Sequence, residues 1–284
     1  MLPCSRQGLA PSPNLTYLTY ILSTYLLVAG CQTHGTEKPQ TAAPVDATPT
    51  PALSIKRYFV DIQGGTTMIG DNRSDHHNEK PPRRVDVADF RIWRHEVTVA
   101  EYEMCTKTGA CDPMENPGCH LFSEDWEFHP RNCASFYQAS QFAEWLAAQG
   151  VAGARLPSAA EWEFAARGAG KKPRAYPWGR RPATCSFIVM ANDTGPGCGT
   201  GTSWPVCSHM AGATPEGLCD MSGNLWEWVT KTTTEMDLPI QATLKGGSFL
   251  NSNPNNHVGY RAFPQAVDNS NINFGFRIAA DAIR

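Results

Sequence analysis

The segment GLCDMSGNLWEWV, residues 217–229, says more about the fold than any other stretch of this chain. Gly223 permits a tight turn, because glycine has no side chain to restrict its backbone. Trp226 and Trp228 follow the turn, and a third tryptophan, Trp162, lies upstream. Tryptophan buries a large apolar surface, so we expect these three side chains to pack in the core.

Three stretches upstream of this segment have the apolar periodicity and the end signals of helices. Thr98 with Glu101, and Ser158 with Glu161, have the spacing of a capping box. Each stretch stops at a glycine, a residue common at helix ends. The predicted helices span 98–109, 135–150 and 158–168, and the second should bury Ala139, Phe142, Ala143 and Leu146 on one face.

Short runs of β-forming residues indicate strands at 57–62, 85–92, 242–247 and 274–280. Between residues 171 and 215 the chain is rich in Gly, Pro and Cys and has little periodicity. So long an irregular segment needs disulfides or a bound metal to hold it. We therefore expect one compact, loop-rich α+β domain over residues 55–284, with about three helices and few short strands.

The first 54 residues are not expected to belong to this domain. Residues 15–30 are apolar, and residues 27–31, LVAGC, resemble a bacterial lipobox with Cys31 as the lipidated residue. A plain signal peptide or an uncleaved anchor is the alternative. Residues 1–30 are then the signal peptide, and residues 31–54, rich in Pro, Thr and Ala, are a tether. Because Gln32 and not aspartate follows the cysteine, we expect an envelope protein held by lipid alone, at the outer membrane of a diderm bacterium.

Eight of the ten cysteines fall within the predicted domain. An even number in an exported chain indicates disulfides, and without a C-x-x-C pair no zinc site is expected. Eight cysteines can pair in many ways. If neighbours in sequence pair, the bonds are Cys105–Cys111, Cys119–Cys133, Cys185–Cys198 and Cys207–Cys219.

Charge excludes one class of partner. The formal net charge is -3, and no basic block stands out along the chain. Nucleic acid binding needs clustered Lys and Arg to displace counterions, so nucleic acid is not an expected partner.

Five motifs occur in order between residues 155 and 280: RLPSAAEWEFAARG, YPWG, GLCDMSGNLWEWV, KGGSF and FGFRIAA. Together they resemble the formylglycine-generating enzyme (sulfatase-modifying factor) family. The resemblance runs from about Tyr58 to Arg284 and implies a fold related to C-type lectins. Members of that family include a copper-dependent oxidase that converts a sulfatase cysteine to formylglycine. Others are oxidoreductases of pyoverdine and ergothioneine synthesis, and non-catalytic binding proteins.

The loop after KGGS bears on catalysis. In the family's copper oxidase, two cysteines of this loop hold Cu(I), a soft ion suited to thiolates. The matching positions here are Asn251 and Asn256, and amides do not bind Cu(I) usefully. Ser248 matches the family's active-site serine and is the catalytic candidate. The resemblance therefore implies that copper and formylglycine generation are lost.

The same loop, Phe249 to Arg261, is dense in asparagine, whose amide offers donors and an acceptor without charge. We interpret it either as a binding surface for a protein or peptide, together with segment 265–274, or as a polar loop in which asparagine favours turns. The pattern also resembles the variable region of retroelement-diversified proteins. We expect Arg261 and Arg277 to pair with a buried carboxylate, the alternative being contact with an anionic ligand. The ligand-binding candidates are Asn251, Asn256, His257, Tyr260 and Arg261.

The resemblance also implies a structural calcium ion, because calcium takes carboxylate and carbonyl oxygens. Its ligands would be the side chains of Asp220 and Glu227 and the carbonyls of Gly223 and Leu225. Alternatively, Asp220 caps the turn and Glu227 is a surface acid. A second family calcium site would use Asn192, but its acidic ligand falls near Cys198, so we expect that site to be weak or absent. His76, His77 and Glu79 are expected to be solvated and not to bind iron or zinc.

Two hypotheses for function follow. The first is a monomeric binding or scaffold lipoprotein that captures a protein or peptide with the asparagine-dense loop. The second is an oxidoreductase of the same family, resembling the pyoverdine-maturation member, that acts on a peptide or protein without the cysteine pair. Loop-dependent capture of a partner supports the first, and turnover that is lost with Ser248→Ala supports the second. A retained copper oxidase ranks third.

Overall fold

The computed structural model describes residues 56–70, 80–113, 117–119, 125–170, 174–230, 241–253, 255–262 and 264–283. Cys31 and the group His76, His77 and Glu79 lie outside these residues. None of the helices in the described ranges is long and apolar enough to cross a membrane.

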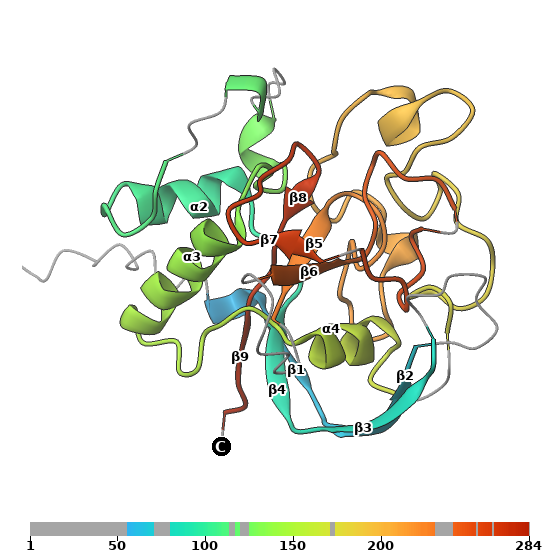
Figure 1. Ribbon diagram of the computed structural model, residues 1–284, viewed down its shortest axis with the longest axis horizontal. Coiled ribbons are helices and arrows are strands. Elements are labelled where there is room, and N and C mark those ends of the chain that lie inside the picture. The colour runs from blue at the N-terminus through green and yellow to red at the C-terminus, as the bar shows by residue number, and fades with distance from the viewer. Residues whose placement is uncertain are drawn as a thin grey trace, which may run out of the picture. The chain divides into compact units, whose positions relative to one another are not determined.

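Short strands form three sheets in the described part of the chain, as seen around the centre and lower edge of Figure 1. One antiparallel sheet joins the two ends of the domain and consists of β1 (Phe59–Ile62), β4 (Phe90–Trp93) and β9 (Ala279–Asp281). An antiparallel ribbon consists of β2 (Gly65–Ile69) and β3 (Arg83–Val87). The third sheet has the order β7 (Gln265–Ala266), β6 (Gln241–Lys245), β5 (Trp226–Val229) and β8 (Phe274–Gly275), with β5 and β8 parallel.

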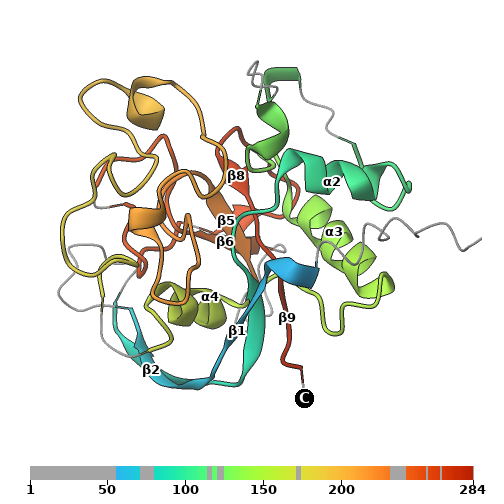
Figure 2. The same cartoon turned by 180° about the vertical axis from the view of Figure 1, so that it is seen from behind.

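The three predicted helices are confirmed as α2 (Val99–Thr106), α3 (Phe136–Ala148) and α4 (Ala159–Ala166), of which α2 and α3 lie side by side in Figure 1 and Figure 2. Both predicted capping boxes are present: the Glu101 amide donates to Thr98 Oγ1 at 3.3 Å and the Glu161 amide to Ser158 Oγ at 3.1 Å. Ser135 and Gln138 form a third box at the start of α3. The predicted apolar face of α3 is buried.

Single-turn 3₁₀ helices occur in the connections between these elements. They span Lys56–Tyr58, Pro117–Cys119, Trp126–Phe128, Pro196–Gly199 and Met210–Gly212.

Two predicted strands are wrong as single elements. Segment 85–92 ends one strand, β3, and begins another, β4, because the chain changes sheets at Ala88 and Asp89. The Asp89 carboxylate accepts the Gly64 amide at 2.8 Å, which fixes the corner. Segment 274–280 likewise divides into β8 and β9, which belong to different sheets.

The core contains the expected tryptophans. Trp162 and Trp228 are fully buried and Trp226 is nearly so. Trp228 packs with the helices α2 and α3, whereas Trp162 belongs to a second cluster under the β-ribbon. All four disulfides expected between neighbouring cysteines are present, so that prediction is confirmed.

Candidate functional site

A buried ion pair lies at the centre of the domain. Glu227 and Arg277 are both 0 % exposed. Arg277 Nη2 and Nε donate to the two Glu227 oxygens at 2.6 Å each, and Trp162 Nε1 donates to Oε2 at 2.7 Å. The expectation of a buried carboxylate partner for Arg277 is therefore confirmed, and Glu227 is not a surface acid. These charge-assisted hydrogen bonds connect three parts of the fold: Glu227 in β5, Arg277 between β8 and β9, and Trp162 in α4.

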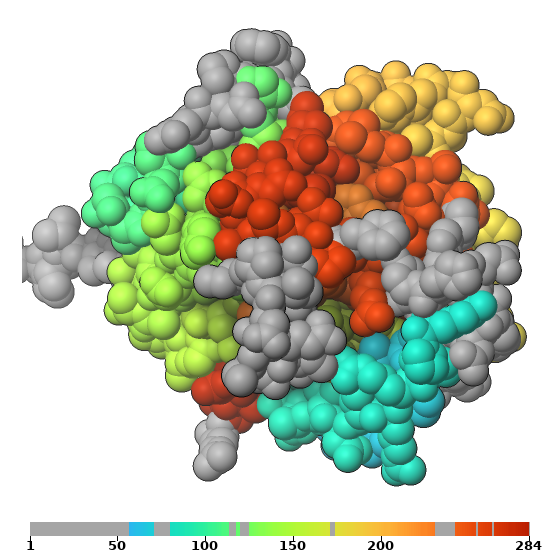
Figure 3. Space-filling view, in the orientation of Figure 1, coloured from blue at the N-terminus to red at the C-terminus, as the bar shows by residue number. Residues whose placement is uncertain are grey.

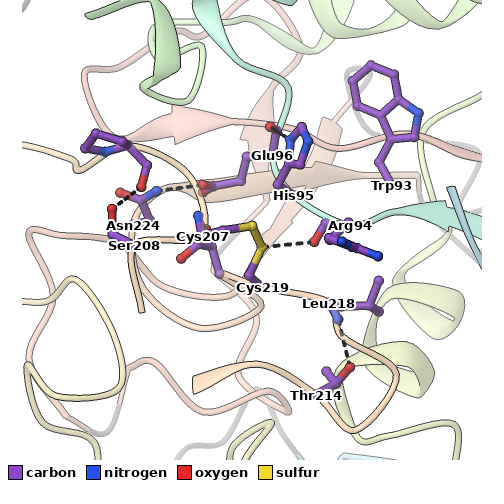
Figure 4. The surroundings of a disulfide bond; sticks show 12 residues. Trp93, Arg94, His95, Glu96, Cys207, Ser208, Thr214, Leu218, Cys219 and Asn224 are labelled. Carbon is purple, nitrogen blue, oxygen red and sulfur yellow. Dashed lines mark hydrogen bonds between the residues drawn. A yellow bond between two sulfur atoms is a disulfide. The ribbon is translucent and has the colours of Figure 1, made fainter. Parts of the chain in front are cut away.

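A second buried carboxylate, Glu96, holds the turn of the 217–229 segment. One of its oxygens accepts the Asn224 side-chain amide at 2.8 Å (Figure 4), and the other accepts the Leu225 backbone amide, also at 2.8 Å. Gly223 in this turn has φ +80°, and a Cβ there would lie 2.5 Å from the Val189 carbonyl oxygen. Only glycine fits this position, so Gly223 is what allows the turn that brings Asn224 and Leu225 to the Glu96 carboxylate.

Asp220 is the third buried carboxylate, and it bonds the neighbouring disulfide loop. Its Oδ2 accepts the Cys207 amide at 2.6 Å, and Cys207 is bonded to Cys219 (Figure 4). Burial raises the pKa of Asp220, although the Cys207 amide and Arg277 oppose the rise. Burial also raises the pKa of Glu96 well above its ordinary value, and the charges of Asp220 and Glu227 add to the effect. Three carboxylates thus face one guanidinium.

The donor chemistry suits a hard cation at this cluster, because the carboxylates outnumber the buried positive charges. Within the described residues, one group of three or more potential metal ligands has its ligand atoms within 4.8 Å of one another: Cys207, Cys219 and Asp220. Its two sulfurs are joined as a disulfide, so Asp220 is the ligand that remains. Glu227 would have to share an oxygen with Arg277. Gly223 and Leu225 flank Asn224 in the Glu96-bound turn and would supply carbonyls.

Asn192, the suggested ligand of the second calcium site, hydrogen-bonds residues close to it in sequence. Its Oδ1 accepts the Thr194 amide at 3.0 Å and the Thr194 hydroxyl at 2.6 Å. Its side-chain nitrogen contacts Cys185 Sγ at 3.4 Å, beside the Cys185–Cys198 disulfide. Asn192 therefore closes a turn, as asparagine commonly does.

Ser248, the catalytic candidate, lies inside a network of amides. It is 0 % exposed, donates to Asn251 Oδ1 at 2.7 Å and accepts Asn273 Nδ2 at 3.0 Å. Among the described residues, the hydrogen-bond partners of the hydroxyl are the Asn251 and Asn273 side chains and the Leu250 amide.

The two asparagines that replace cysteines shape the loop from within. Asn256 is 0 % exposed, and its Nδ2 donates to the Asn251 carbonyl at 3.1 Å. Its Oδ1 is buried without a hydrogen-bond partner, and a Cβ on Gly247, whose φ is +77°, would lie 1.9 Å from that atom. Asn256 therefore does not reach the surface, whereas Asn251 is partly exposed.

The other ligand-binding candidates lie nearer the surface. Arg261 is exposed, while His257 and Tyr260 are half-buried. The His257 ring meets the Tyr176 ring edge-on at 4.8 Å, and the Tyr260 ring packs 5.7 Å from that of Trp226. The loop thus leaves four of the five candidates, Asn251 among them, at least partly exposed and directs one, Asn256, inward. Figure 3 shows the orange and red C-terminal residues across the middle of one face.

Sequence reasoning missed Glu96 and Asn224 as organisers of the site. Glu96 is 0 % exposed yet lies more than a hundred residues before its partners, so no local pattern reveals it. Glu96 follows the end of β4 by three residues, and its burial becomes evident only from the structure. Acids are rarely buried without a partner. Asn224 stands inside the motif itself, next to the glycine turn.

Comparison with known proteins identifies relatives of the domain. A family model described as "Sulfatase-modifying factor enzyme 1-like domain" matches residues 46–282. The formylglycine-generating enzyme of Mycobacterium tuberculosis is 28% identical over 303 residues, which cover 79% of this chain and 98% of that protein. A mouse protein named inactive C-alpha-formylglycine-generating enzyme 2 is 31% identical over 140 residues, 46% of this chain and 44% of its own. The solved structure of PvdO from Pseudomonas aeruginosa has a TM-score of 0.65 at 22% identity, covering 79% of this chain and 94% of that one.

Proposed function

Because the chain belongs to the sulfatase-modifying factor enzyme 1-like domain family, we propose that it keeps the family's fold as a binding module without copper-dependent oxidation. One observation carries this proposal. Asn251 and Asn256 stand at the positions of the copper-binding cysteines, and their amides are used in bonds within the loop around buried Ser248. A loop with no thiolate and no accessible nucleophile supplies a surface for recognition.

The proposed surface is the exposed part of the loop 249–261 and the adjoining segment 265–274. Leu250, near the start of the loop, is 42% exposed in spite of its apolar side chain, and Arg261, at the end of the loop, is also exposed. An apolar side chain among asparagines and one arginine is typical of sites that bind a protein or peptide. We expect the chain to act as a monomer, which mass photometry would test.

Copper binding tests the central claim. Titration of the full-length protein with Cu(I) against a competing chelator should show no tight site, because amides are poor ligands for a soft ion. The matched variant Asn251→Cys/Asn256→Cys should gain one. Tight stoichiometric Cu(I) in the unaltered protein, together with oxygen consumption in the presence of a cysteine peptide, would overturn the proposal.

A second candidate function is an oxidoreductase of the same family that acts on a peptide or protein without the cysteine pair. The observation that favours it is the identity to the M. tuberculosis enzyme over nearly that protein's full length. Oxygen uptake with peptide substrates, lost on Ser248→Ala and kept in Ser252→Ala on the same loop, would support this alternative. If no oxygen is taken up with any peptide substrate, this alternative is wrong and the proposal of a binding module stands.

Calcium at the Asp220 cluster is part of the proposal. The ion would balance the excess of carboxylates and stabilise the turn at Gly223, with Asp220 and Glu227 as side-chain ligands and Gly223 and Leu225 as carbonyl ligands. Elemental analysis of protein purified without chelators should find about one calcium per chain. Asp220→Asn should remove it, and Asp193→Asn, an exposed aspartate near Asn192, should not. Absence of calcium, with thermal unfolding unchanged by EDTA, would contradict it.

The envelope location is also proposed, from the lipobox-like LVAGC. Cys31→Ser should move the protein from the outer-membrane fraction to the soluble fraction and abolish incorporation of labelled palmitate. Cys4→Ser changes another cysteine of the same N-terminal region and should do neither. Unchanged fractionation of Cys31→Ser would rule out the lipid anchor.

A further inference from the structure

A pocket of about 330 Å³ lies between the YPWG motif and the asparagine-dense loop. The two segments are neighbours on the right of Figure 1, in yellow and orange-red. From the first segment come Ala175, Tyr176, Arg180 and Pro182, and from the second come Asn253 and His257. The two segments are more than seventy residues apart in sequence, so the fold alone brings them together.

The walls of this pocket are built rigidly. The Tyr176 and Gly179 backbones exchange hydrogen bonds at 3.0 and 2.9 Å, and the Val258 amide bonds the Ala175 carbonyl at 3.0 Å. The Tyr176 hydroxyl bonds Asn253 Oδ1. A site whose walls are held before binding loses little freedom when a ligand arrives.

Stacked rings support the wall from behind. The Tyr176 ring stacks on Trp178 at 4.7 Å, and Trp178 stacks on Phe187 at 5.0 Å. The Arg181 guanidinium covers the Phe187 ring at 4.6 Å. Because Tyr176 is only 3% exposed, its ring supports the pocket and offers no open face for stacking against a sugar.

Among the described residues that line the pocket, Arg180 carries a positive charge and none is an acid. Residues 164–192 contain six Lys or Arg and no Asp or Glu, and residues 241–267 also contain no acid. Most of the described arginines of the first segment are used: Arg167 pairs with Glu163 and Arg174 donates to the Pro177 carbonyl at 2.8 Å. Arg180 is exposed at the pocket and makes no ion pair with any described residue.

From these observations we infer that the pocket binds an acidic side chain of a peptide. Arg180 would bind the carboxylate, and the apolar side chain of a neighbouring peptide residue would lie against Pro182 and Ala175. A guanidinium fork matches one carboxylate with two parallel hydrogen bonds. The pocket lies at the small end of ligand sites, which suits one or two amino-acid side chains. Asn253 and His257 at the rim can bond the peptide backbone. This inference rests on the proposed binding function and names its ligand.

Affinity selection with paired peptide libraries tests the inference. One library of acetylated, amidated hexapeptides carries aspartate at a fixed central position, and the other carries asparagine there, with uncharged residues elsewhere. Retention on immobilised full-length protein is measured by mass spectrometry. The aspartate library should be retained about tenfold or more over its partner, the effect of one charge-assisted pair.

Variants assign the effect to the pocket. Arg180→Gln should reduce retention of the aspartate library to that of the asparagine library. Arg84→Gln removes the same charge from an exposed arginine of β3 and should leave the preference intact. Equal retention of the two libraries, or a preference that survives Arg180→Gln, overturns the inference.

A carboxylated oligosaccharide, oligogalacturonate, distinguishes the other class of ligand. Binding of this probe that depends on Arg180, without retention of the aspartate peptides, would assign the pocket to anionic glycans and overturn the peptide assignment. Copper and oxygen measurements are independent of these outcomes. If the protein binds neither peptide nor copper, the peptide inference is wrong but the proposal of a binding module stands. If it shows copper-dependent turnover, the proposed function itself is wrong.

Discussion

The helices between residues 98 and 168 and the irregular segment 174–225 are held by different means. In the first region, α2, α3 and α4 each begin at a capping box, so their ends are fixed by residues three positions apart. In the second region, residues 174–225, the regular elements are two 3₁₀ helices. This region is held by two disulfides and by backbone hydrogen bonds to distant residues. Among these are Ala191 to Asn251 and Gly197 to Phe249. Local sequence therefore determines one region, and long-range contacts determine the other.

The largest effect is expected where the long-range contacts converge, at the buried pair of Glu227 and Arg277. Arg277→Met leaves the Glu227 carboxylate buried without its cation, which should lower the free energy of unfolding by about 3–5 kcal/mol. Urea unfolding followed by circular dichroism measures this loss.

A double variant sharpens this result. Glu227→Gln/Arg277→Met removes both charges, so its loss should be smaller than the sum of the two single losses. Additive losses, or a loss below about 1 kcal/mol for Arg277→Met, would show that the pair is not what holds the centre.

The next largest effect separates the two regions directly. Cys185→Ser/Cys198→Ser opens a disulfide whose cysteines are 13 residues apart, and the unfolded chain then gains freedom equivalent to about 3 kcal/mol. Hydrogen exchange should increase in residues 185–219 and stay unchanged in α3. Equal increases in both regions would mean that the irregular segment is not a separate unit of stability.

Most of the first region could be predicted from the sequence, because its signals are local. Thr98 with Glu101 and Ser158 with Glu161 mark helix starts at the observed positions, and the buried face of α3 follows from its period. The disulfides were also accessible, since each cysteine pairs with its neighbour in sequence.

The rest depends on contacts that a single sequence does not display. β5 pairs in parallel with β8 across almost fifty residues, and the strand expected at 85–92 divides because its halves join different sheets. Glu96 organises the candidate site from a distant strand end. The inward direction of Asn256 goes with the close approach of Gly247, and the segment with Arg180 is joined to the asparagine-dense loop by the bond from the Val258 amide to the Ala175 carbonyl.

A smaller effect is expected in how the free energy of unfolding depends on pH. It comes from the ion pair between Glu163 of α4 and Lys245 of β6. Burial alone would raise the pKa of Glu163, but Lys245 and Arg167, both within 2.9 Å of its oxygens, lower it below the ordinary value. The unfolded chain therefore takes up this proton at a higher pH than the folded one. The stabilisation is present above the unfolded pKa of about 4.3 and is lost as the pH falls through the lower folded pKa.

Glu163→Gln removes this contribution. Urea midpoints measured between pH 7 and pH 3 should show the variant less stable at pH 7, with the gap to the unaltered protein narrowing as the pH falls. Glu103→Gln, on the exposed side of α2, should run parallel to the unaltered protein. A constant gap for Glu163→Gln would mean that the carboxylate is not charged in the folded state.

The smallest effect compares one substitution in the two regions. Ser135 caps α3 by accepting the Gln138 amide at 3.2 Å, so Ser135→Ala should cost about 1 kcal/mol. Ser208 donates to the Pro205 carbonyl in the irregular segment, where the side chain is exposed and water can replace the bond. Ser208→Ala should therefore cost less than about 0.5 kcal/mol. Thermal unfolding of both variants measures the difference, and equal costs would mean that local hydrogen bonds matter as much in the irregular segment as in the helices.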